Sequence, residues 1–198
     1  MRVDRGQIHT LEAFLAALLI VGALLFATQA TAVTPLSAST ANQHIENQHE
    51  SVAEDLLRLT ANNGSLQEAM LYWNVSDGQF DGAPENMSAY TGTPPDGNPL
   101  NDSLRAAFGT GELAYNIELR HHTADGDDAV QPMFEMGSPS DHAVTATRTV
   151  NLYETDTLTS TEYEGEQLTE VEDFWAENVD EDAALYNSVE VRITVWRM

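Results

Sequence analysis

The 198-residue chain contains no cysteine and no lysine. Without cysteine there are no disulfides, so a folded domain must be stabilised by a hydrophobic core of its own. All eight basic residues are arginine, against 32 acidic residues, and the formal net charge is −24 at pH 7. An acidic excess of this size argues against nucleic acid as a partner, because binding to phosphates needs clustered basic residues.

The sequence also lacks the motifs of familiar catalytic chemistry. It has no glycine-rich phosphate loop, no His-Glu-x-x-His motif and no serine between elbow glycines. The run Asp125-Gly126-Asp127-Asp128 lacks the later glutamate of a calcium loop, so we interpret it as a turn. His121 and His122 are adjacent in a predicted strand and would point to opposite faces. We therefore expect no enzyme activity, no cofactor and no metal site.

One long apolar segment dominates the N-terminal region. Residues 13–33 are nearly all apolar or small, which is enough to cross a bilayer as a helix. Arg2 and Arg5 precede the segment and no basic residue closely follows it, so we expect the N-terminus in the cytoplasm and residues beyond 34 outside. A secretory signal has the same order of charge and apolar residues, and Ala30-Thr31-Ala32 could be its cleavage site.

The residues before the apolar segment favour a different kind of signal. Arg5-Gly6-Gln7, followed by Glu12 where the apolar run begins, resembles the class III signal of haloarchaeal type IV pilin-like membrane proteins. The resemblance implies that a prepilin peptidase cuts between Gly6 and Gln7, removing residues 1–6 and leaving the helix in place. It also implies that Glu12, the sixth mature residue where the family usually has its acid at the fifth, pairs with the amino terminus of a neighbouring pilin-like subunit.

Beyond the membrane segment of residues 7–33, an amphipathic helix is predicted over residues 34–62. Ile45, Val52, Leu56 and Leu59 form one apolar stripe, and Asn63-Gly64 is typical of a helix end. Pro35 is expected to kink the helix rather than break it.

The remaining residues, 63–198, predict an acidic extracellular α+β head. Alternating apolar and polar residues predict strands over residues 113–120, 144–152 and 189–196, and a weaker strand over 130–136. Short helices are predicted over residues 66–73, 101–108 and 169–178, and a loop over 74–99. We expect the long helix to cover one face of an antiparallel sheet of three to four strands, in a pilin-like α+β fold.

Four Asn-x-Ser sequons crowd into the segment between the helix and the sheet. Their position on the exported side favours glycosylation of Asn63, Asn74, Asn86 and Asn101.

Two functions remain open at this stage. The chain is expected to be a single-pass surface protein that enters, or associates with, a type IV pilus-like filament or secretion assembly. Alternatively, it is a permanent anchor whose head binds the surface layer or a solute. In both cases the 30 acidic residues beyond residue 34, against six arginines, indicate a surface adapted to high salt.

Overall fold

A computed structural model describes the backbone of residues 4–109 and 111–198, with all of their side chains except those of residues 4–8 and 29–42. The chain forms two compact units, the first ending at Ile45 and the second beginning at Glu46. The predicted α+β class is confirmed: a long N-terminal helix is followed by short helices and a four-stranded antiparallel sheet.

Helix α1 spans Asp4–Asn63, 60 residues, and supplies the first unit and the start of the second. Its bounds include Pro35, so the prediction that the helix continues past this residue is confirmed. The helix ends where Gly64 adopts a left-handed conformation with φ of 87°. Glycine takes this conformation without steric cost, which explains why the chain turns there.

The part of α1 in the head unit packs on the core through a stripe that shares Val52 and Leu56 with the predicted one but not Leu59. The buried side chains are those of Ala53, Leu56, Leu57 and Thr60, whereas Leu59 is 57% exposed. The prediction was therefore correct for Leu56 and wrong for Leu59. Residues three or four positions apart lie on the same face of a helix, so Ala53 and Thr60 share the buried face with Leu56 and Leu57. Leu59 points away from that face although it is more apolar than Ala53 or Thr60.

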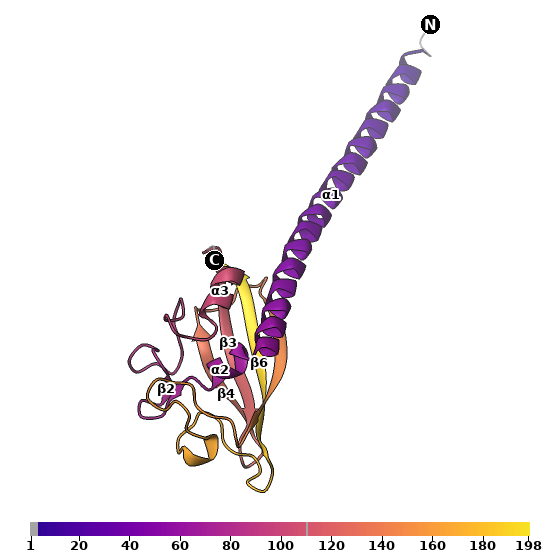
Figure 1. The fold of residues 1–198 in the computed structure, drawn as a ribbon. Helices are drawn as coiled ribbons and strands as arrows, with labels where there is room; N and C mark the ends of the chain where they lie inside the picture. The colour runs from indigo at the N-terminus through magenta and orange to yellow at the C-terminus, as the bar shows by residue number, and fades with distance from the viewer. Residues whose placement is uncertain (1–3, 110) are drawn as a thin grey trace. The chain divides into compact units, whose positions relative to one another are not determined.

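The sheet has the strand order β4-β3-β6-β5 (Figure 1), with β3 at Leu113–His122, β4 at Asp128–Glu135, β5 at Val144–Tyr153 and β6 at Leu185–Arg197. All neighbours are antiparallel. The four predicted strands are confirmed, each with longer or slightly shifted ends. The C-terminal strand β6 lies in the interior, and the side chains of Val189, Val191, Ile193 and Val195 are fully buried.

The first edge strand, β4, is interrupted. Pro132 lies in its middle and has no backbone N–H, and the register between β3 and β4 shifts at Ile117/Glu118. The weak prediction for this strand is confirmed, since proline is tolerated on an edge. The turn predicted at Asp125–Asp128 is also present, with Gly126 at a φ of 85°.

Short elements fill the segment between α1 and the sheet. Helix α2 covers Ser65–Met70, shorter than predicted, and α3 covers Asn101–Phe108, as predicted. The predicted loop contains a small hairpin of β1, Trp73–Asn74, and β2, Gln79–Phe80. Rings from this segment stack against the sheet, with the centroids of Tyr90 and Phe134 4.8 Å apart.

The predicted acidic surface helix over residues 169–178 is wrong. Only a single turn, η1 at Leu168–Glu170, is helical, and Asp173 has a positive φ of 66°. Phe174, Trp175 and Ala176 are consecutive and all buried, which a surface helix does not allow. The indole nitrogen Nε1 of Trp175 donates a hydrogen bond to the carbonyl oxygen of Met70. Tertiary contacts in an irregular segment of bends therefore override the helical spacing of Leu168, Val171 and Trp175.

Candidate functional site

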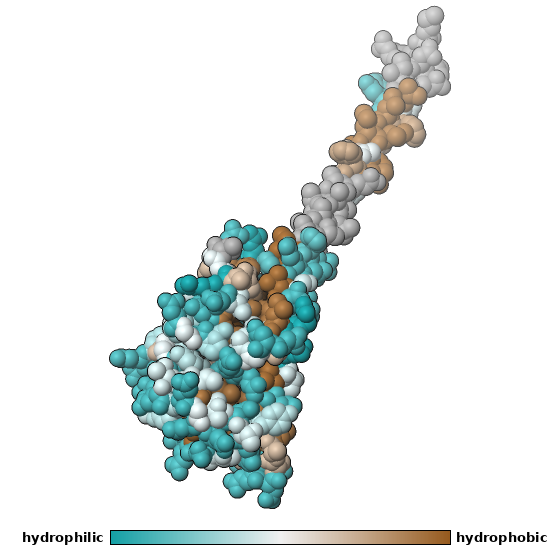
Figure 2. All heavy atoms as spheres, in the orientation of Figure 1, coloured by the Kyte–Doolittle hydropathy of each residue, from teal (hydrophilic) through white to brown (hydrophobic). Residues whose placement is uncertain are grey.

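The first candidate site is the apolar part of α1. Residues His9–Thr28 have a mean hydropathy of 2.3 and none of this segment is buried. At 1.5 Å per residue, 20 residues give a length of about 30 Å, the thickness of a bilayer core. Large apolar side chains are exposed on every side of this segment, as Figure 2 shows in brown for the side that faces the viewer. A helix apolar on every face needs lipid or other apolar helices around it.

Glu12 is the single charged residue within this segment. Its Oε2 lies 3.6 Å from Nδ1 of His9, and both side chains are more than three-quarters exposed. Sequence analysis missed this neighbour, although the spacing of three residues on a helix would have indicated it. Because the carboxylate is exposed, it is accessible to a group from another chain.

The predicted processing residues Arg5, Gly6 and Gln7 fall within the bounds of α1, and their side chains lie outside the described residues. Cleavage between Gly6 and Gln7 therefore stays a prediction.

The four sequons occupy very different environments. Asn86 is exposed in a turn and has a positive φ of 63°. Asn63 is also exposed, but its Oδ1 accepts hydrogen bonds from the backbone N–H and the hydroxyl of Ser65. The Nδ2 of Asn74 approaches Glu162 at 3.4 Å. Asn101 is only 7% exposed. Asn86 is the sequon best placed for an enzyme to reach.

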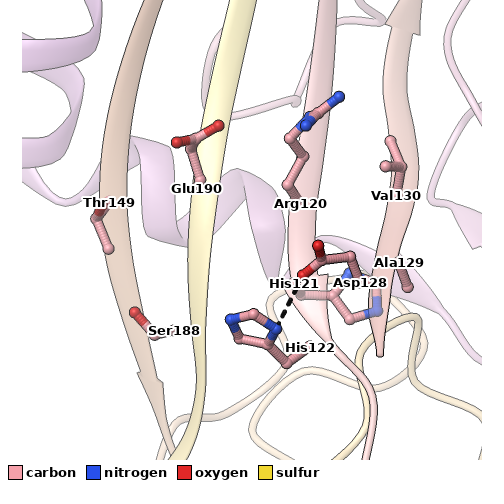
Figure 3. Close-up of a pocket in the computed structure, with 9 residues that line it drawn as sticks. All are labelled: Arg120, His121, His122, Asp128, Ala129, Val130, Thr149, Ser188 and Glu190. Atoms are coloured by element: carbon pink, nitrogen blue, oxygen red, sulfur yellow. Dashed lines mark ion pairs between the residues drawn. The ribbon is translucent and has the colours of Figure 1, made fainter. Parts of the chain in front are cut away.

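The solvent-facing side of the sheet forms a second candidate site, which sequence analysis did not predict. A shallow hollow of about 340 Å³ lies over β4, β3, β6 and β5. Figure 3 shows the side chains around it: Arg120, His122, Asp128, Val130, Thr149, Ser188 and Glu190. Nδ1 of His122 lies 3.1 Å from a carboxylate oxygen of Asp128. The alternation of the strands places these side chains on one face.

Charges on this face alternate in sign. Glu118 stands opposite Arg192 across β3 and β6, and Arg120 stands opposite Glu190. Within each strand, Arg120 Nε is 3.8 Å from Glu118 and Arg192 Nη2 is 3.5 Å from Glu190. Arg120 and Arg192, two of the six arginines beyond residue 34, are therefore diagonal neighbours on this face. The hollow can hold a small polar ligand, but its open, exposed groups offer no activated nucleophile.

The two adjacent histidines have separate environments, as the strand alternation predicted. His122 faces the hollow, whereas His121 is 7% exposed and packs edge-on against Trp175, with ring centroids 5.2 Å apart. Burial lowers the pKa of His121 below its usual value. Within the part of the chain that the structure describes, no three His, Asp or Glu side chains gather as metal ligands.

These features define the class of protein: an α+β protein whose N-terminal apolar helix is a membrane anchor or a signal sequence. The model of the Family of unknown function (DUF7288) matches residues 5–195, so the chain belongs to this family. The match includes both the apolar helix and the sheet. No curated protein and no solved structure matches the chain.

Proposed function

We propose that this chain is a pilin-like surface protein of an archaeal membrane, without enzyme activity. A prepilin peptidase cuts between Gly6 and Gln7, residues 7–33 stay in the membrane, and the acidic head is outside the cell. From there the chain enters, or associates with, a type IV pilus-like filament or secretion assembly. The observation that carries the proposal is the single helix α1, which joins an apolar span to the core of the head.

The continuity of α1 supports retention of the helix after processing. A secretory cut after Ala30-Thr31-Ala32 would fall inside α1 and leave part of the same helix on each product. A cut before Gln7 leaves the whole of the apolar segment attached to the turns that pack on the sheet. The family match, which runs from residue 5, also includes the apolar helix together with the head.

Glu12 supports assembly over simple anchoring. An acidic side chain within an apolar segment is costly unless it has a partner. His9, three residues earlier, provides a partner of opposite charge only when its ring is protonated. In an assembly, the free amino group created at Gln7 of a neighbouring subunit would provide a permanent one.

A second function is favoured by the hollow on the sheet. Its alternating charges, with Arg120 and His122 beside Glu190 and Asp128, suit a small polar solute or the surface layer. In this alternative the chain stays anchored in the membrane as a binding protein.

Mass spectrometry of the N-terminus of the mature protein from native cells tests the processing step. We expect the chain to begin at Gln7, and Gly6→Val to block trimming because the peptidase needs a small residue there. An intact Met1 contradicts the pilin-like function, and a start near Val33 contradicts the anchor as well.

Replacement of Glu12 separates assembly from anchoring. Glu12→Gln should leave membrane insertion intact and reduce the amount of the head in isolated surface appendages. Glu50→Gln is the matched control, because it removes the same charge from an exposed position of α1 in the head unit. Equal incorporation of both variants, or absence of the normal protein from every appendage, favours the fixed-anchor alternative.

A further inference from the structure

The two edges of the sheet differ in a way that bears on what the head binds. Edge strands present unpaired backbone groups, and proteins usually protect them with lysine, proline, charge or bulges. The β4 edge has this protection from Pro132, from the register shift, and from the acidic residues Asp128 and Glu135. The other edge, β5, has no proline and no acidic residue, its register shift lies only at its end between Leu152 and Tyr153, and its single charge is Arg148.

Strand β5 is ten residues long and its register with β6 is regular from Val144 to Leu152. The segment of residues 142–153 contains no acidic residue, proline or glycine, in a chain with 32 acids. Within the described part of the chain, β5 pairs with a strand on one side only. Its side chains on the solvent face of the sheet are polar, uncharged and exposed: Thr145, Thr147, Thr149 and Asn151.

One charge lies on this edge. Arg148 shares the inner face of the sheet with Ala146 and Val150, yet its side chain is exposed. Among the described residues it has no ion pair and no side-chain hydrogen bond. Of the six arginines beyond residue 34, Arg58, Arg120 and Arg192 lie beside carboxylates. The other three have no ion pair among the described residues, and of these only Arg148 lies on the β5 edge.

We propose that the β5 edge binds an extended segment of a partner protein, which adds a fifth strand to the sheet and places a carboxylate opposite Arg148. Backbone hydrogen bonds to an edge supply affinity in this mode, and side chains that alternate along the added strand supply specificity. Side chains directly opposite across antiparallel strands have Cβ atoms about 5 Å apart, within reach of an ion pair. The inference does not rest on assembly into a filament, since an anchored head presents the same edge.

A second copy of this chain fits the edge less well. The β5 strand of another copy offers no carboxylate to Arg148.

Binding of a labelled peptide to the full chain in detergent micelles tests the proposal. The probe is the acetylated, amidated peptide SVTVEVTVS, compared with SVTVKVTVS, in which lysine replaces the central glutamate. Fluorescence anisotropy should show tighter binding of the glutamate peptide, by about threefold to tenfold, which is the size expected for an exposed charge reversal. Amide hydrogen exchange should slow within residues 144–152 when this peptide is present.

Arg148→Glu should make the lysine peptide bind more tightly than the glutamate peptide, which reverses their order of affinity. The fold should stay intact, because the replaced side chain is exposed. The matched control is Arg197→Glu, an exposed arginine at the end of the interior strand β6, which should leave the order unchanged. Three results overturn the proposal. They are protection outside β5, an unchanged order in Arg148→Glu, and a dimer of the free chain, detected by light scattering, that this variant abolishes.

Discussion

Truncation of Leu57 tests whether the end of α1 belongs to the core of the head. The Leu57 side chain is 2% exposed and lies in one hydrophobic cluster with Ile117, Leu119 and Val191 of the sheet. Removing a fully buried leucine side chain to alanine loses its transfer free energy and leaves a cavity, at a cost of roughly 3 kcal/mol. The equilibrium constant for unfolding should therefore rise by about two orders of magnitude.

Leu59→Ala is the matched control on the same helix turn. Leu59 is 57% exposed, so its replacement should change the free energy of unfolding by less than about 0.5 kcal/mol. The two variants have the same change in composition and nearly the same position in sequence. They differ only in which face of α1 they alter.

Urea unfolding of the full chain in micelles, followed by tryptophan fluorescence, provides the measurement. All three tryptophans, Trp73, Trp175 and Trp196, are buried in the head unit, so the signal reports on the head and not on the membrane helix. Equal losses in the two variants, or a larger loss for Leu59→Ala, would show that α1 does not pack on the sheet through the face described above.

Three further predictions concern salt, pH and modification. The urea midpoint of the full chain should rise between about 0.05 M and 1 M salt, because screening of the −24 charge removes repulsion; an unchanged midpoint refutes a high-salt adaptation. The pKa of His121 is lowered in the fold, so the unfolded chain takes up the proton first and stability should fall as the pH drops below about 6.5. His121→Phe should flatten this pH dependence, and an unaltered slope would assign it to other groups. If the sequons are used, digestion after both aspartate and glutamate, which puts Asn86 and Asn101 on different peptides, and mass spectrometry should find a glycan on Asn86 and none on Asn101, whose side chain is 7% exposed; the reverse pattern contradicts the exposures described here.

The sequence by itself determined the elements whose signals are local. Period-two alternation located β3, β5 and β6, and the absence of glycine and proline over residues 37–60 located the second half of the long helix, because strand and helix periods are properties of neighbouring residues. The turn at Asp125–Asp128 was also local, since glycine marks the left-handed position. The apolar segment could be recognised for the same reason, whereas an assembly role for Glu12 stays a prediction.

Only the tertiary structure decided the features that depend on distant partners. The C-terminal strand became an interior strand because β3 and β5 flank it, which no property of its own residues indicates. The helical spacing around Trp175 gave way to an irregular segment because the ring packs against His121 and its nitrogen donates a hydrogen bond to the carbonyl oxygen of Met70. Only the register of the strands brings four polar side chains to one hollow, those of Arg120, His122, Asp128 and Glu190. Such contacts join residues far apart in the chain, so local patterns carry no information about them.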